Sequence, residues 1–554
     1  MPARRLGRAR GRTTTVALEV SAYADSFARD RLPARALWPE LEIADVRNRW
    51  PRRINAAAAI LDGATARFAD RPCLLTPDAV WTYAELLDRA NRIAAALVED
   101  FGLAPGARVL LRGANSPMLA ACWFAVLKAG GIAVTTMPLL RARELTEIVN
   151  RAEATIALCD ERIVGELQLA SAACPGLRRV ACFHSATDQG LEAAMARHNG
   201  AFVNFTPSHD DVALIAFTSG TTGKPKATLH FHRDVLTICQ TVADSELRLE
   251  PADIVAGAAP LGFTYGLGSL LLFPLWSGAS TLLLERCTAD ILAGCFRRMP
   301  ITTLMIGPTL YRALLPLLRD EDFAALRTCC SSGEHLAASL FTAWRERTGV
   351  DIRNLLGATE MLHAFVAAPE RGAKPGSLGR ALPGYRAQVV DEAMRPVPPG
   401  VVGRLAVRGP TGCRYLDDEA RQRTYVVGGW NLTGDAFRQD EDGTLWHHAR
   451  ADDIIVSSGY NISGVEVEDV LLEHPLVAAC AVVGAPDEAR GPIAKAFVVP
   501  TDTARAGPRL ARALQDHVKQ VLAPYKYPRA NEFREALPLT PTGKVQRSAL
   551  RVGA

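Results

Sequence analysis

The alternation of short apolar runs with amphipathic segments, from about residue 50 to 435, most restricts the fold of this chain. RVLLRG (108–113) predicts a strand, PMLAACWFAVLKAGG (117–131) a helix that ends in two glycines, and IAVTTM (132–137) the next strand. Such alternation favours α/β layers with largely parallel sheets. In contrast, GVVGRLAVRGP (400–410) predicts an antiparallel strand between turns.

The last hundred residues have a different pattern, with no repeat or long linker before them. EVEDVLLEH and PRLARALQDHVKQVLAP predict helices, and LVAACAVVGAP and IAKAFVVP predict strands. We expect a small α+β domain over 452–554, a large domain over 41–451, and a partly disordered N-terminal extension over 1–40.

Composition excludes several classes of function. A net charge of +4 over 554 residues gives no indication of nucleic-acid binding. No run approaches the roughly 20 apolar residues of a membrane span, and no apolar signal core follows the arginine-rich N-terminus. The twelve scattered cysteines, without a CxxC pair, predict reduced thiols in a cytoplasmic protein.

A glycine-rich string, TSGTTGKPKA, directly follows the predicted buried strand DVALIAF (211–217). Its glycines can expose backbone N–H groups, while hydroxyls and lysines add donors and charge, an array that suits a polyphosphate. It is not a Walker loop, because two residues instead of four precede Gly-Lys and Pro225 follows. We expect a flexible flap over phosphates; the alternative is a surface turn. The expected phosphate-binding residues are Thr218, Ser219, Gly220, Thr221, Thr222, Gly223, Lys224 and Lys226.

This string resembles the phosphate loop of the adenylate-forming superfamily, which includes acyl- and aryl-CoA ligases, peptide-synthetase adenylation domains and luciferases. Further motifs resemble that family in order over about residues 50–550: LLGATEMLHAF, NLTGDAF, RADDIIVSSGYNIS and LPLTPTGKVQR. The resemblance implies an α/β fold class, in which layered α/β subdomains and a β-barrel-like subdomain precede a small mobile α+β domain. It also implies an AMP-forming acid–thiol ligase that uses ATP, Mg²⁺ and coenzyme A.

Nucleotide and metal roles follow from the matched motifs. Glu360, with Thr218, is the expected Mg²⁺ site, since a hard cation prefers oxygen ligands. The resemblance assigns ribose contacts to Asp435 and Arg450; a turn-capping role is the alternative for Asp435. SSGEHL (331–336) is expected to begin a helix beside the adenine, although Glu334 could simply favour a helix N-terminus. The remaining AMP-binding candidates are Gly333, His335, Gly357, Ala358 and Thr359.

The C-terminal motifs imply a two-step reaction. Lys544, presented by a Pro-Thr-Gly turn, would act with Lys226 and Glu360 while the acid attacks the α-phosphate; the alternative is a solvated lysine. Asp452 matches the hinge on which the small domain rotates, with an exposed salt-bridging pair as the alternative. The pantetheine channel would be lined by Ser458, Gly459 and Tyr460.

The acid would lie beside AAPLGFTYGLGSLLLFPLWSGA (258–279), which is similar to a benzoate-ligase string. His363 would meet the substrate carboxylate. The other expected pocket residues are Phe263, Tyr265, Gly266, Gly333 and Ala358.

Longer stretches, among them SAYADSFARDRLPARALWPEL and APYKYPRA, resemble 2-aminobenzoate (anthranilate)–CoA ligases. The alternatives are benzoate, hydroxybenzoate or a short aliphatic acid, transfer to a carrier protein in place of CoA, or a non-catalytic binding protein. A homodimer is compatible with the sequence, which does not define the oligomeric state.

Overall fold

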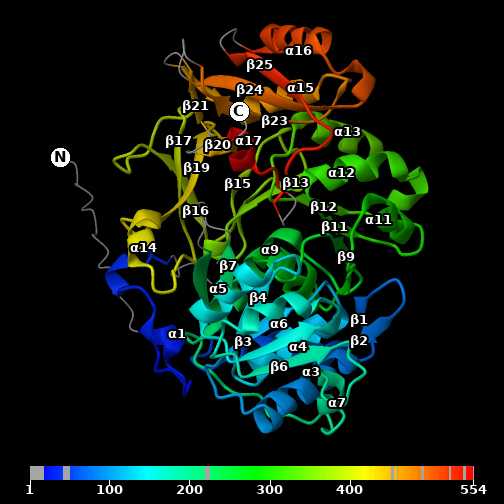
Figure 1. Ribbon diagram of the computed structural model, residues 1–554, viewed down its shortest axis with the longest axis vertical. Helices are drawn as coiled ribbons and strands as arrows, with labels where there is room; N and C mark the ends of the chain where they lie inside the picture. The colour runs from blue at the N-terminus through cyan, green and yellow to red at the C-terminus, as the bar shows by residue number, and fades with distance from the viewer. Residues whose placement is uncertain are drawn as a thin grey trace, which may run out of the picture.

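The computed structural model describes residues 18–41, 50–218, 225–450, 454–457, 460–487, 492–522, 526–540 and 544–552. These residues form five sheets, with two large α/β layers in the body of the molecule and a small domain above them (Figure 1). The predicted hinge residue Asp452 lies outside the described residues.

The first large sheet has six strands. Five of them run parallel, and the edge strand β8 pairs antiparallel with β7. Their order is β6 (Arg179–Phe183), β5 (Ile156–Asp160), β3 (Arg108–Arg112), β4 (Ile132–Thr136), β7 (Val212–Thr218) and β8 (Lys226–Phe231). The predicted strand, helix and strand over 108–137 are therefore confirmed. Helix α4 (Pro117–Lys128) joins β3 to β4, and Ser116 Oγ caps it by accepting from Leu119 N.

The second large sheet has nine strands, with antiparallel strands only at its two edges. Their order is β15 (Arg380–Ala381), β14 (Ala364–Ala367), β13 (Ile352–Gly357), β12 (Thr328–Ser331), β11 (Thr303–Met305), β9 (Ile254–Gly257), β10 (Ser280–Leu282), β1 (Pro72–Leu75) and β2 (Val80–Thr82). Because β9 to β13 run parallel, the segments that follow β12 and β13 leave the sheet at the same edge, and both carry predicted site residues.

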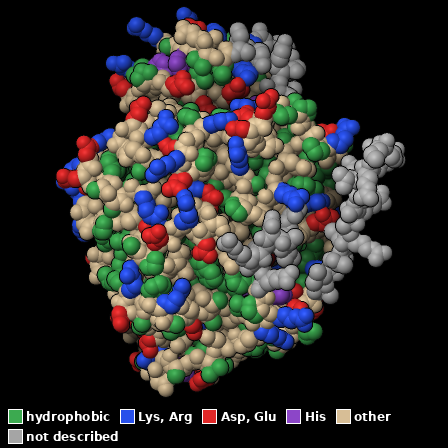
Figure 2. Space-filling view, turned by 180° about the vertical axis from the view of Figure 1, so that it is seen from behind, with side chains coloured by type: hydrophobic (Ala, Val, Ile, Leu, Met, Phe, Trp, Pro, Cys, Tyr) green, Lys and Arg blue, Asp and Glu red, His purple; other side chains and the backbone are tan. Residues whose placement is uncertain are grey.

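The helices of the large domain lie around its sheets. They are α1 (Phe27–Asp30), α2 (Gly63–Phe68), α3 (Tyr83–Ala95), α5 (Ala142–Ala152), α6 (Gly165–Ser171), α7 (Leu191–Met195), α8 (His232–Ile238), α9 (Thr264–Leu267), α10 (Phe273–Ser277), α11 (Ala289–Phe296), α12 (Pro308–Leu314), α13 (Ala338–Thr348) and α14 (Glu419–Tyr425). None of the helices in the described ranges is long and apolar enough to traverse a bilayer. On the face in Figure 2, acidic and basic side chains are interspersed, in keeping with the small net charge.

An antiparallel sheet forms the third part of the large domain. Its strands are β16 (Arg386–Val390), β17 (Gly403–Arg408), β18 (Val426–Val427), β19 (Trp430–Gln439) and β20 (Leu445–Arg450). Strand β17 lies within the predicted antiparallel segment 400–410 and pairs antiparallel with β16 and β19. This prediction is therefore confirmed.

The small domain has the predicted helices and strands. Its elements are β21 (Ile454–Ser457), β22 (Tyr460–Ser463), α15 (Gly464–Leu472), β23 (Val477–Ala485), β24 (Ile493–Pro500), α16 (Pro508–Val521), β25 (Ala530–Phe533) and α17 (Arg547–Val552). Val467 and Leu471 of α15 pack with Val482, Ala496 and Leu514 in its core. The mobility of this domain and the predicted domain boundaries stay predictions.

The described part of the N-terminal extension packs on the large domain. Trp38 lies against Phe231, and both rings contact the guanidinium of Arg414. Arg414 is completely buried, and its Nη1 donates to the equally buried Asp234 Oδ2 at 2.9 Å. Residues 18–41 therefore help to enclose a buried ion pair.

Candidate active site

The ends of the glycine-rich loop lie at one edge of the six-stranded sheet. Thr218 ends β7, Lys226 begins β8, and the two residues are direct partners in the antiparallel pair. The predicted strand before the loop is confirmed. The predicted phosphate-binding residues 219–224 lie outside the described residues, so their role stays a prediction.

A tight turn after β13 carries the predicted metal and acid ligands. Met361 N donates to Ala358 O at 3.0 Å, and Leu362 N donates to Thr359 O at 3.0 Å. Leu362 has φ of 71°, a costly conformation for a branched side chain that persists only when the surroundings enforce it. The turn packs against β7, so Glu360 lies near the strand that ends in Thr218.

Glu360 is held by a residue that the sequence did not indicate. Its side chain is buried, and its Oε1 accepts from Tyr415 Oη at 2.7 Å. Burial and then the neighbouring Cys413 and Glu360 raise the pKa of Tyr415, so its hydroxyl stays protonated and donates. The backbone of Tyr415 forms a bridge with Thr228 of β8, which ties this contact to the phosphate-loop hairpin.

The donor chemistry near β7 fits a magnesium ion. A carboxylate and a threonine hydroxyl are hard oxygen ligands, and Mg²⁺ commonly completes its shell with water and phosphate oxygens. Across the described ranges, no group of three or more His, Cys, Asp or Glu side chains could hold a metal alone. The Mg²⁺ roles of Glu360 and Thr218 stay predictions.

The two residues predicted to contact the ribose pair with each other across neighbouring strands of the antiparallel sheet. Asp435 in β19 and Arg450 in β20 are direct backbone partners. The side chain of Arg450 lies outside the description, as do Ser458 and Gly459 and the side chain of Tyr460, whose backbone begins β22. The ribose and CoA roles of these residues stay predictions.

The segment SSGEHL (331–336) does not begin a helix, so this prediction is wrong. Helix α13 starts only at Ala338, and Gly333 adopts φ of 88° in a turn. The physical reason is that Glu334 bonds to a different helix: its Oε2 accepts from Thr309 Oγ1 at 2.8 Å and from Thr309 N at 3.3 Å, in the first turn of α12. The alternative considered for Glu334 concerned its own segment, where no helix begins.

Lys544 of the small domain reaches the Gly333 turn. A Cβ atom placed on Gly333 would lie 3.4 Å from Lys544 Cε. Thr540 N donates to Lys544 O at 2.6 Å, and Lys544 N donates to Thr540 Oγ1 at 3.1 Å, so the lysine backbone is fixed to Thr540. Two predicted site segments that are distant in sequence therefore meet.

His363 lies in an aromatic environment within the predicted acid pocket. Its ring stacks on Tyr265 at 5.3 Å between centroids and meets Phe273 edge-on at 4.6 Å. Its Nε2 is 3.3 Å from Ser269 Oγ and 3.3 Å from Tyr265 O, while its Nδ1 has no partner among the described residues. Burial lowers the pKa of His363 to about 4, so the imidazole is neutral near pH 7.

The remaining predicted pocket residues shape the backbone around His363. Phe263 precedes α9 as its N-cap. Gly266 permits a close approach, because a Cβ there would lie 2.1 Å from Pro260 O. A Cβ on Gly357 would lie 2.7 Å from His363 O, and Ala358 N donates to that same oxygen at 3.4 Å.

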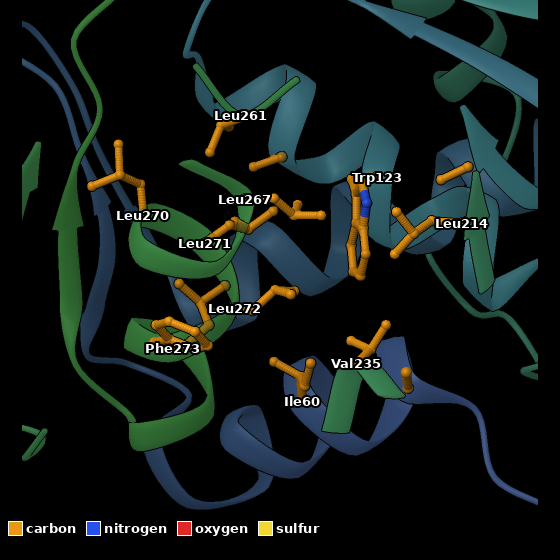
Figure 3. Packing of buried hydrophobic residues seen from close by; sticks show 14 of the residues in the cluster. Ile60, Trp123, Leu214, Val235, Leu261, Leu267, Leu270, Leu271, Leu272 and Phe273 are labelled. Atoms are coloured by element: carbon orange, nitrogen blue, oxygen red, sulfur yellow. The ribbon is translucent and has the colours of Figure 1, made fainter. Parts of the chain in front are cut away.

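The helical segment after Phe263 has two different faces. Gly268 and Ser269 face His363, whereas Leu267 and Leu271 point toward Trp123 of α4 (Figure 3). The latter face borders an apolar cavity of about 10 Å³. That volume holds about one water molecule, so this cavity is not the predicted acid pocket.

Family models match most of the chain. The model of the AMP-binding enzyme matches residues 61–414, and that of the AMP-binding enzyme C-terminal domain matches residues 466–544. The chain belongs to the AMP-binding enzyme family. The predicted adenylate-forming superfamily, its fold class and its ligase class are confirmed for this AMP-binding enzyme.

Individual relatives of this AMP-binding enzyme include two CoA ligases. Benzoate–CoA ligase of Thauera aromatica is 33% identical over 507 residues, which cover 90% of this chain and 96% of the relative. An uncharacterized acyl–CoA ligase, YtcI of Bacillus subtilis (strain 168), is 34% identical over 85% of this chain and 90% of its own length.

Among solved structures, the anthranilate CoA ligase AuaEII in complex with anthranoyl-AMP has a TM-score of 0.87 and is 32% identical, covering 91% of this chain and 98% of its own. The identities to the benzoate and anthranilate ligases are nearly equal, so they do not distinguish the two acids.

Proposed function

We propose that this AMP-binding enzyme is an ATP-dependent aryl-CoA ligase that activates 2-aminobenzoate as its adenylate and then forms the CoA thioester. The observation that carries this proposal is the meeting of Lys544 with the Gly333 turn. A cation from the small domain is thereby brought to the edge of the nine-stranded sheet, where Glu360 and His363 also lie.

In the first step, a carboxylate oxygen of the acid attacks the α-phosphorus of ATP, and the bond to pyrophosphate breaks. Both partners are anions, so the site must offset their repulsion. Lys544 would do so at the α-phosphate, and Lys226 would do so near the loop. Bound Mg²⁺ would neutralise phosphate charge, and Glu360, fixed by Tyr415, would hold it.

In the second step, the sulfur of CoA attacks the adenylate carbonyl, the thiol proton is lost and AMP departs. Lys544 would obstruct this approach. Rotation about Asp452 would withdraw it and bring Ser458, Gly459 and Tyr460 over the site.

The unpartnered Nδ1 of His363 supports an acid with a polar group beside its ring. If Nε2–H donates to Tyr265 O, Nδ1 is an acceptor for an ortho-amine; if Nε2 accepts from Ser269 Oγ, Nδ1–H donates to a carboxylate. The sequence stretches similar to 2-aminobenzoate ligases favour the amine. Benzoate, a hydroxybenzoate or a short aliphatic acid is the second candidate.

Acid-dependent exchange between ATP and pyrophosphate tests the proposal, followed by mass detection of the CoA thioester. We expect the fastest exchange with 2-aminobenzoate, near-complete loss in Lys544→Ala, and little change in the control Lys519→Ala, which alters an exposed side chain of α16. Absence of exchange with every acid would refute the ligase. Exchange without a thioester would instead favour transfer to a carrier protein. A cytoplasmic location and a homodimer stay predictions.

A further inference from the structure

Two adjacent carboxylates on α15 point to different partners. We propose that Glu468 and Asp469 are positioning residues that together place Lys544 over the Gly333 turn for the first half-reaction. Glu468 holds the segment that carries Lys544, and Asp469 holds the segment that carries Gly333. This inference rests on the proposed role of Lys544.

Glu468 fixes the small-domain side of the contact. Its side chain is only 8% exposed, both of its oxygens accept from Arg547 Nη2, at 2.7 and 2.6 Å, and Oε1 also accepts from Val482 N at 2.7 Å. Arg547 follows Lys544 by three residues and begins α17. Hydrogen bonds to a buried charge are strong, so the segment that carries Lys544 is tied firmly to α15.

The described residues on the two sides of 541–543 are bonded to each other. They are joined by the Thr540 and Lys544 hydrogen bonds and by Gln546 N, which donates to Pro538 O at 2.8 Å. A displacement of Arg547 should therefore also displace Lys544. A change at Glu468 should act on the lysine even though the carboxylate lies inside the small domain.

Asp469 fixes the other side. Its Oδ1 accepts from His335 Nε2 at 2.7 Å, and His335 lies two residues after Gly333. A second contact between the domains is close by, since Arg312 Nη1 of α12 donates to Ala478 O at 3.1 Å. The predicted adenine-flanking residue His335 is thus engaged by the small domain.

The two anchors define where the lysine stands. Lys544 is three residues before Arg547, which binds Glu468, and Gly333 is two residues before His335, which binds Asp469. The two residues are so close that a Cβ placed on Gly333 would lie 3.4 Å from Lys544 Cε. The Asp469 contact must break if the small domain rotates, whereas the Glu468 contact can travel with it. Asp469 should therefore support the first half-reaction and not the second.

The test measures the two half-reactions separately. Exchange between ATP and pyrophosphate reports the first, and thioester formation from CoA and chemically prepared acyl-adenylate reports the second. We expect Asp469→Ala to slow exchange about tenfold, because one hydrogen bond to a charged group is lost. The rate of the second step should stay within twofold of wild type. Glu473→Ala, an exposed carboxylate at the end of α15, is the matched control.

A double-mutant cycle keeps the test independent of folding. If Asp469 acts through His335, the variant with both residues changed to Ala should exchange no more slowly than either single variant. Glu468→Gln keeps the shape of the side chain and removes its charge, and it should also slow exchange. A further change of His335 to Ala should not restore the exchange rate of this variant. Equal losses in both half-reactions, additive losses in the cycle, or unchanged exchange in Asp469→Ala would overturn the proposal. Wild-type protein that shows no exchange with any acid would instead refute the proposed function.

Discussion

Lowering the pH tests whether His363 is neutral in the site. Because burial lowers its pKa to about 4, about 99% of the imidazole is neutral at pH 6. An exposed histidine with a pKa of about 6.5 would be only about 24% neutral at that pH. If the site needs the neutral form, the exposed group would lower kcat/KM about fourfold between pH 8 and 6, whereas His363 should change it by a few per cent.

The assay is the pH profile of kcat/KM for exchange, which reports groups of the free enzyme. We expect no inflection from His363 between pH 6 and 8. His363→Gln should lower kcat/KM for the acid about tenfold or more, because the hydrogen bond that Nδ1 makes to the bound acid is lost, and should keep the shape of the profile. An acid limb near pH 6.5 in wild type that His363→Gln lacks would refute the reasoning.

Other predictions concern side chains around the site. Tyr415→Phe should raise the Mg²⁺ concentration for half-maximal exchange about tenfold, because Glu360 loses its donor; an unchanged Mg²⁺ dependence would contradict that role. Asp234→Ala should lower the free energy of unfolding by about 3–5 kcal/mol, because it leaves a buried arginine unpaired; denaturant titration measures this, and near-wild-type stability would count against it. Gly266→Ala should lower the melting temperature and the exchange rate, whereas Gly294→Ala, which meets nothing within 4 Å, should not; equal effects of both would contradict the steric argument.

Local patterns in the sequence are sufficient for much of the fold. The buried strand over 212–218 and the helix over 117–128 form where their apolar patterns and end signals place them. The segment SSGEHL (331–336) shows the limit of such patterns. Its helical prediction is wrong because Glu334 bonds to α12, and a contact between segments far apart in the chain has no local signal.

The same limit applies to the site. Motifs resembling a known family indicate Glu360, His363 and Lys544 individually, since each lies in a characteristic string. Tyr415 is 55 residues from Glu360 in the chain, and its contact with Glu360 becomes visible only when β8 brings the two segments together. The pairing of Asp469 with His335 depends on how the two domains dock, and no local sequence pattern indicates such a contact.

The contact of Lys544 with the Gly333 turn has a consequence for the order of events in turnover. A small domain that is already docked needs no large movement before the acid and ATP react. The large movement is then required only after pyrophosphate leaves, and we expect undocking to limit the overall speed. In such an enzyme, substitutions at the interface between the large and small domains would change kcat even where they do not touch the reacting atoms.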